Sequence, residues 1–184
     1  MAMKEAPSGA RGLVLVFTGN GKGKTTAALG TVLRAVGYGH RCLIVQFIKE
    51  KGVSGEQAAL ARLAPEAEIV SLGRGFVGIM NDQLPRQEHI EAAAKALAFA
   101  REKIVSGVYR LVVLDEILVA LKLQLIPLAG VLELLEVRPH EVTLILTGRG
   151  APPEVIERAD TVTEMTEIKH AFQRSIPALR GVDF

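Results

Sequence analysis

The sequence predicts an α/β fold of three layers, a mainly parallel sheet with helices on both faces. Short apolar segments alternate with longer segments of helical composition along the chain. Such apolar segments are typical of strands buried on both faces, and their alternation with helices calls for a mainly parallel sheet covered on both sides. A chain of 184 residues suits one domain. We expect this domain at residues 13–184, after a flexible N-terminal tail at residues 1–12.

Strands are expected wherever a short apolar run stands between turn signals. The first run, LVLVF, leads directly into a glycine-rich loop, and the second, RCLIVQF, follows two glycines. The expected strands cover residues 13–17, 41–47, 67–72, 110–115, 141–147 and 160–165. Ligands of parallel sheets bind beyond the carboxyl ends of the strands. Thr18, Asp115 and Thr147 each close a strand, so we expect them to gather at one edge, where the chemistry would take place.

Helices are expected in the segments between these strands. Gly37 and Gly39 terminate the first helix, and Pro127 interrupts the helical region late in the chain. The expected helices cover residues 24–36, 56–63, 85–105, segments within 117–137, and 153–158. The longest of them carries one apolar stripe, formed by Ile90, Ala93, Leu97, Ala100 and Ile104.

Residues 18–25, TGNGKGKT, resemble a phosphate-binding loop that is one residue short. The usual pattern places four residues between its first glycine and the closing Gly-Lys-Thr, whereas Gly19 stands only three residues before Gly23. Glycines let several N–H groups turn inward around phosphate oxygens, and the following helix N-terminus adds positive partial charge. Lys24 would reach the phosphates, and Thr25 would place its hydroxyl on Mg²⁺. The alternative, a plain glycine turn, leaves the Lys-Thr pair unexplained.

A second acidic element follows the apolar strand LVVLD. In phosphate-binding sites of this kind a hydrophobic strand ends in carboxylates that hold Mg²⁺. Either Asp115 or Glu116 would bind the metal, directly or through water, and the other would be a second ligand or a base. Taken alone, two carboxylates at a strand end are often merely solvated.

Two arginines are further candidates for binding polyphosphate. Arg149 lies between two glycines after another apolar strand, and a guanidinium suits multidentate contact with phosphate oxygens. A plain surface turn is the alternative. Arg34 lies on the expected first helix. A solvated arginine is the simpler interpretation, and a ligand role is the alternative.

Composition and charge exclude several other classes of protein. The formal net charge is +2 and no dense block of Lys and Arg occurs, so nucleic acid is not indicated as the main partner. No apolar run reaches membrane-spanning length, and the first twelve residues lack the apolar segment of a signal peptide. We therefore expect a cytoplasmic protein without a membrane partner.

The cysteine and histidine content predicts no zinc or disulfide framework. The single cysteine, Cys42, lies in an apolar run and is expected to be a buried strand residue. His40, His89, His140 and His170 lack the spacing of metal ligands, so they are expected at the surface or as capping residues. His170, in the segment EIKHAF, has the strongest claim to a functional role.

Five segments together resemble one known family. They are TGNGKGKTTAALG (residues 18–30), LIVQFIK (43–49), VVLDE (112–116), LTGR (146–149) and EIKHAF (167–172). The chain resembles the ATP:corrinoid adenosyltransferases of the CobA/CobO/BtuR type, and the similarity runs from about residue 12 to residue 184. The shortened loop, followed by VQFIK and closed by IKHAF, is a specific combination.

The resemblance implies a RecA-type P-loop fold and an activity other than phosphoryl transfer. In this family a cobalt(I) corrinoid attacks the 5′ carbon of ATP, a Co–C bond forms and triphosphate leaves. The short loop is associated with ATP held in reversed polarity, so that the 5′ carbon faces the corrinoid. Our physical interpretation is that a tighter ring of N–H groups shifts where each phosphate lies. The implied substrates are ATP and a cobalamin, cobinamide or cobyrinic acid a,c-diamide, with Mg²⁺, or alternatively Mn²⁺, as the metal.

The resemblance also assigns roles to individual residues. Lys24 and the metal would neutralise the departing triphosphate, with Thr25 and Glu116 as metal ligands and Asp115 as a supporting carboxylate. Cobalt(I) is itself a strong nucleophile, so no general base is required. The nucleotide would be held by the loop residues Gly19, Asn20, Gly21, Lys22, Gly23, Lys24, Thr25 and Thr26, with Arg34 and Arg149.

The sequence departs from the family in one segment. Many members have an aromatic pair in a segment like GFTW that presses on the lower corrin face, whereas this chain reads GFVG at residues 75–78. Phe76 matches the first aromatic residue, but Gly78 replaces the tryptophan. Phe76 would act with another apolar group, Ile79 or Met80, or the preferred corrinoid differs. Simple packing of the loop is the alternative role for Phe76.

Family members usually form dimers, so a homodimer is expected, as is a reductase or electron donor that generates cobalt(I). Two other functions fit the glycine loop. One is an ATP hydrolase of the RecA type, in which Glu116 would activate water. The other is a module that binds nucleotide or corrinoid without turnover, which the missing tryptophan would suit.

Overall fold

Six parallel strands form one sheet at the centre of the molecule. The computed structural model describes residues 10–52, 54–75, 77–78 and 82–183. The strands are β1 (Val14–Thr18), β2 (Cys42–Gln46), β3 (Ala67–Ser71), β4 (Leu111–Asp115), β5 (Thr143–Thr147) and β6 (Thr161–Glu164). Their order across the sheet is β3-β2-β4-β5-β1-β6, and every pair of neighbours is parallel.

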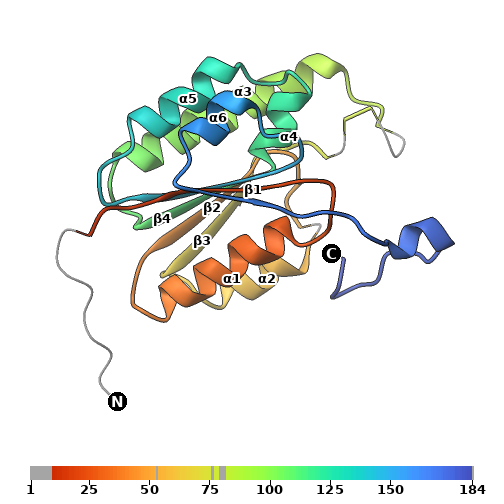
Figure 1. Ribbon diagram of the computed structural model, residues 1–184, viewed down its shortest axis with the longest axis horizontal. Helices are drawn as coiled ribbons and strands as arrows, with labels where there is room; N and C mark the ends of the chain where they lie inside the picture. The colour runs from red at the N-terminus through yellow and green to blue at the C-terminus, as the bar shows by residue number, and fades with distance from the viewer. Residues whose placement is uncertain (1–9, 53, 76, 79–81, 184) are drawn as a thin grey trace.

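Helices cover both faces of this sheet (Figure 1). The helices are α1 (Lys24–Val36), α2 (Gly55–Ala61), α3 (Arg86–Val105), α4 (Ile117–Lys122), α5 (Leu128–Glu136) and α6 (Pro153–Glu157), with a 3₁₀ helix η1 (Ala171–Arg174). Helices α1 and α2 lie on one face, and α3, α4, α5 and α6 lie on the other. The three-layer α/β prediction is therefore confirmed.

Each face of the sheet has its own hydrophobic core, because alternate strand residues point to opposite sides. Leu43, Val112 and Leu144 pack under the helices of one face, whereas Ile44 and Val113 pack against the α1 side. The strands β2 and β4 are buried along their whole length. Such strands read as continuous apolar runs, which is why the sequence revealed them so clearly.

The order of the strands brings the functional segments to one edge of the sheet. Strand β5 lies between β1 and β4, so Thr147 ends between the glycine loop after β1 and the carboxylates after β4. The register aligns these ends, with Phe17 opposite Thr147 and Gln46 opposite Asp115. The predicted gathering of Thr18, Asp115 and Thr147 at the carboxyl edge is thus confirmed.

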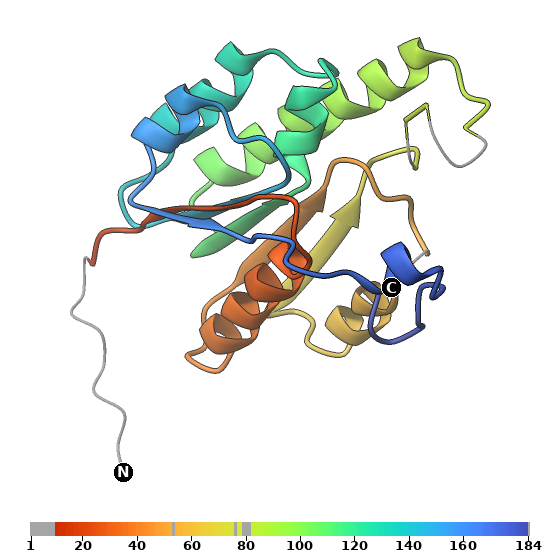
Figure 2. The same cartoon turned by 45° about the vertical axis from the view of Figure 1, so that its right-hand side comes forward.

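The start of the described chain is held beside the sheet. Near the start, Gly12 donates its backbone N–H to the His140 carbonyl at 2.7 Å, and Arg11 pairs with Asp160 at 2.7 Å. The first nine residues of the expected tail lie outside the described part. After β6 the chain runs outward to η1 and then returns toward the start of α1 (Figure 2).

Two local features differ from the sequence-based expectation. His89 is buried at 3% exposure on α3, not at the surface, because its Nε2 lies 3.0 Å from Asp82 Oδ2 and this contact satisfies a polar ring nitrogen inside the protein. The 3₁₀ helix η1 was not expected, since its signal is a single cap in which the Phe172 N–H donates to His170 Nδ1 at 3.2 Å. The capping role expected for a histidine is confirmed at His170.

No helix in the described part of the chain is long and apolar enough to cross a membrane.

Cys42 should be inert in the folded protein. It is fully buried on β2, and burial raises the pKa of its thiol to about 11, so the reactive thiolate is scarce at neutral pH. We expect no reaction with a chromogenic disulfide reagent at pH 8 in buffer, and one thiol per chain after unfolding in guanidinium chloride. Rapid labelling of the native protein would contradict the burial of β2.

Candidate active site

The glycine loop joins β1 to α1 and presents the N-terminus of that helix. Gly23 caps α1 with a φ of 114°, a left-handed conformation that a side chain would oppose. No acidic residue occupies the first turn of α1. The positive end of the helix therefore carries no carboxylate of its own and suits an anion.

Lys24 lies folded over this loop. Its Nζ donates to the Gly19 carbonyl at 2.7 Å and to the Gly21 carbonyl at 2.6 Å. Burial lowers the pKa of Lys24, and the nearby Arg149 guanidinium lowers it further, whereas Glu116 opposes both effects. A bound polyanion would offset the repulsion from Arg149, so this ammonium group is well suited to phosphate.

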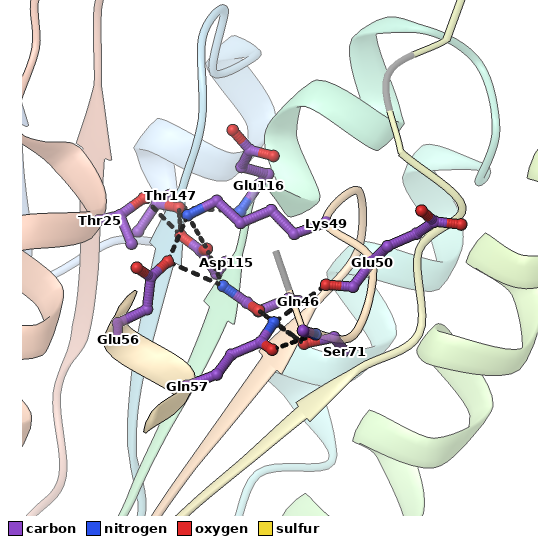
Figure 3. A network of polar contacts seen from close by, with 11 residues as sticks. Thr25, Gln46, Lys49, Glu50, Glu56, Gln57, Ser71, Asp115, Glu116 and Thr147 are labelled. Carbon is purple, nitrogen blue, oxygen red and sulfur yellow. Dashed lines mark hydrogen bonds and ion pairs between the residues drawn. The ribbon is translucent and has the colours of Figure 1, made fainter. Parts of the chain in front are cut away.

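Asp115 is the buried centre of the site, with no exposed surface. Its Oδ1 accepts hydrogen bonds from the hydroxyls of Thr25 and Thr147, each at 2.8 Å, and its Oδ2 accepts one from Gln46 Nε2 at 3.1 Å. Figure 3 shows these side chains converging on Asp115. The carboxylate thereby connects α1, β2, β4 and β5 at one point.

Gln46 is in turn held by a second set of polar side chains. Its Oε1 accepts a hydrogen bond from Ser71 Oγ at 2.7 Å and another from Gln57 Nε2 at 3.1 Å. Gln57 also donates to Ser71 Oγ at 2.8 Å. Because buried amides need partners for both ends, this network fixes which end of Gln46 faces Asp115.

Glu116 follows Asp115 and turns into the open part of the site. Its φ of 60° is a left-handed backbone conformation, and its N–H donates to Thr147 Oγ1 at 2.9 Å. Burial, together with the charge of Asp115, raises the pKa of the Glu116 carboxyl to about 7. A strained backbone and a perturbed carboxyl are typical of functional positions.

Lys49 and Glu56 form an ion pair on the β2 side of the site. Lys49 Nζ lies 2.6 Å from Glu56 Oε1 and 3.8 Å from Asp115 Oδ2. Burial alone would lower the pKa of Lys49, but Asp115 and Glu56 together outweigh it and raise that pKa. Lys49 therefore stays protonated.

A cavity of about 680 Å³ opens between these elements. From the loop and α1 it is lined by residues 20–26, and across from them by Lys49, Glu56, Glu116 and Arg149. The end of the described chain forms a further wall, with His170 and residues 181–183. Lys22 Nζ binds this wall through Asp183 Oδ1 at 2.6 Å.

The structure brings most of the expected site residues to this cavity. Asn20, Gly21, Lys22, Gly23, Lys24, Thr25, Thr26, Glu116 and Arg149 line it. Gly19 supplies a carbonyl to Lys24, and Asp115 lies behind Thr25. Arg34 is not brought there, because it lies exposed in the last turn of α1, away from the loop. Phe76, Ile79 and Met80 lie outside the described residues.

Sequence reasoning assigned no role to Gln46, Lys49, Glu56 or Asp183. Gln46 carried a usable signal, since a polar residue in an otherwise apolar run usually has a buried partner. Glu56 lies in the first turn of a short helix, where a carboxylate is ordinary. Nothing local distinguishes Asp183, because its partner Lys22 lies far away along the chain.

The donors at the centre of the site suit a hard cation such as Mg²⁺. Thr25 and Glu116 offer oxygen atoms to the cavity, and the buried Asp115 orients the Thr25 hydroxyl. Mg²⁺ is commonly bound through one or two carboxylates together with substrate phosphates. Within the described residues no group of three or more His, Cys, Asp and Glu residues is placed to hold a metal ion.

The sequence is similar to one family along almost all of its length. Residues 10–184 match the family described as ATP:corrinoid adenosyltransferase BtuR/CobO/CobP. A corrinoid adenosyltransferase of Pseudomonas aeruginosa is 43% identical over 174 residues, which cover 95% of this chain and 84% of that protein. The corrinoid adenosyltransferase of Escherichia coli (strain K12) is 38% identical, with 95% and 86% covered. The one named CobA in Salmonella typhimurium is 36% identical, with the same coverage.

A solved structure supports the fold assignment. The chain is similar to a KaiC-like protein of Pyrococcus horikoshii OT3, with a TM-score of 0.54 over 88% of this chain and 76% of that one. The identity of 20% limits this likeness to the fold. Together with the six parallel strands and the glycine loop, it fits the RecA-type α/β architecture.

The raised pKa of Glu116 predicts a specific dependence of stability on pH. The folded protein, free of metal and nucleotide, holds this proton more tightly than the unfolded chain, so its contribution to stability is present below about pH 4.5 and is lost as the pH rises through about 7. Because Glu116→Gln removes this titration, the variant should gain stability relative to the wild type across that range, by at most about 3 kcal/mol. Urea unfolding at several pH values measures the difference, and a constant difference would contradict the shift.

Proposed function

Because the chain belongs to the ATP:corrinoid adenosyltransferase family, we propose that it transfers the 5′-deoxyadenosyl group of ATP to the cobalt(I) of a corrinoid and releases triphosphate. The observation that carries the proposal is the cavity in which the shortened glycine loop faces Glu116 and Arg149. ATP and a corrinoid are thus the substrates.

The reaction requires little acid–base chemistry from the protein. The electron pair of cobalt(I) forms the Co–C bond with the 5′ carbon, the C5′–O bond breaks, and its electron pair leaves on the triphosphate oxygen. Cobalt passes formally from +1 to +3. What the protein must supply is alignment of the two substrates and stabilisation of the negative charge that grows on the leaving group.

The residues at the cavity suit this task. The loop N–H groups, the N-terminus of α1 and Lys24 present positive charge to the polyphosphate, with Arg149 on the opposite side. Asn20 lies near the start of the loop and lines the cavity, where it would contact the nucleoside. Removal of the polyphosphate from bulk water strengthens each of these interactions.

The metal that fits the site is Mg²⁺, with Mn²⁺ accepted by the same oxygen donors. Thr25 and Glu116 would hold it, with Asp115 as the supporting carboxylate that orients Thr25. When bound, the metal supplies charge neutralisation on the departing triphosphate.

Further parts of the proposal concern partners and location. A cobalt(I) centre must be generated by reduction, so the enzyme requires an electron donor or reductase. Such a reduced substrate favours a reducing compartment, and we place the enzyme in the cytoplasm.

The family resemblance favours a homodimer, and the exposed apolar side chains of Ile168, Phe172 and Leu179 after β6 offer surface for a contact between copies.

The decisive test mixes the protein with Mg-ATP and chemically reduced cobalamin. Adenosyl transfer predicts loss of the cobalt(I) absorbance, a light-sensitive alkyl product and one triphosphate for each cobalt consumed. Formation of ADP and phosphate without corrinoid would instead identify a hydrolase, and tight binding with neither product would identify a binding module.

Replacement of Lys24 by alanine should lower the rate of transfer by at least about 100-fold, because the leaving triphosphate loses its principal protein cation. Lys103→Ala is a matched control, since Lys103 lies in the last turn of α3, outside the cavity, and should leave the rate unchanged. Stopped-flow absorbance of cobalt(I) measures both rates. Near-normal turnover in Lys24→Ala would refute the phosphate role of the loop.

A further inference from the structure

Lys49 is a cation that lines the cavity but does not belong to the glycine loop, and it has not yet been given a role. It follows β2, which is separated from β1 by β4 and β5, so it approaches the site from the side opposite the loop. Its side chain is 30% exposed and lines the cavity. In Figure 3 the side chain extends over Asp115 toward the centre of the site.

Two carboxylates fix the position of its ammonium group. Glu56 Oε1 lies at 2.6 Å and makes a hydrogen bond, whereas Asp115 Oδ2 at 3.8 Å is within ion-pair distance only. Glu56 is fixed in its turn by the first turn of α2 and by Gln46 Nε2 at 3.5 Å. An ammonium has three N–H donors, so Glu56 leaves others for a ligand.

A polyphosphate needs such a group on this side of the cavity. ATP carries several negative charges along its phosphates. Lys24 and the helix terminus serve the loop side, and across from them the lining of the cavity offers Arg149 together with Lys49. Lys22 also lines the cavity, but it belongs to the loop itself and so lies on the same side as Lys24. Lys49 faces the loop from the other wall, and its pairing with Glu56 means that little side-chain freedom is left to lose on binding.

We propose that Lys49 is a further binding residue for the polyphosphate of the substrate and that Glu56 is the positioning residue that holds it there. The inference rests on the proposed function, since it concerns the group that leaves. It predicts that Lys49 contacts the phosphates directly and that Glu56 does not.

A purely structural ion pair is the competing explanation, and paired variants separate the two. If Lys49 served only to neutralise Glu56, Lys49→Met would weaken binding only by leaving the Glu56 charge uncompensated, and the double variant Lys49→Met/Glu56→Gln would bind tripolyphosphate like the wild type. If Lys49 binds phosphate, removal of its charge weakens binding, whereas removal of the Glu56 charge leaves a cation in place and removes an anion that repels phosphate.

The test uses inorganic tripolyphosphate with Mg²⁺ as the probe and calorimetry as the readout, with no corrinoid present. Lys49→Met should weaken binding about tenfold or more, and Glu56→Gln should leave the Kd within about threefold or tighten it. Lys51→Met, an exposed lysine outside the cavity, controls for the change in net charge. Thermal unfolding verifies that each variant is folded, and Lys49→Gln replaces Lys49→Met if the latter does not fold.

Equal weakening in Lys49→Met and Glu56→Gln would overturn the proposal, as would an unchanged Kd in Lys49→Met or in the double variant Lys49→Met/Glu56→Gln. Failure of the proposed function looks different. A wild-type protein that binds tripolyphosphate through Lys49 but does not alkylate cobalt refutes the transferase and keeps the inference. A wild-type protein that alkylates cobalt, with tripolyphosphate binding that is indifferent to Lys49, refutes the inference and keeps the transferase.

Discussion

The buried carboxylate of Asp115 is the interaction on which the site depends. It accepts hydrogen bonds from Thr25, Thr147 and Gln46, so segments that follow or end three different strands are held to one point. An unpaired carboxylate in this place would be costly, because burial of a charge is tolerated only with partners. The fold therefore secures the relative positions of the glycine loop and the acidic strand before any ligand arrives.

The charges of the cavity follow from this arrangement. Asp115 draws Lys49 toward the centre and, with burial, makes ionisation of Glu116 unfavourable, while Lys24 rests on loop carbonyls opposite Arg149. Positive and negative groups are thus preorganised at close range in a half-enclosed space. A reaction whose main demand is the departure of a polyanion gains most from electrostatics that need no rearrangement.

The sequence predicted the sheet well because its central strands are buried on both faces and appear as unbroken apolar runs, as at residues 42–45 and 111–114. The loop and Glu116 were predictable because each follows such a strand within a short motif. Lys49, Glu56 and Asp183 were not, since their roles depend on contacts between segments that are distant in sequence or ordinary in composition. The position of Arg34 could not be predicted either, because distance along a helix, not residue type, keeps it from the cavity.

The backbone at Glu116 has an evolutionary consequence. In the left-handed region a residue with a side chain costs free energy, of the order of 1 kcal/mol. Glycine would avoid this cost and asparagine would reduce it. Selection for folding stability alone would therefore favour another residue at position 116. A glutamate at this position therefore fits a trade in which its proposed role at the metal outweighs conformational ease.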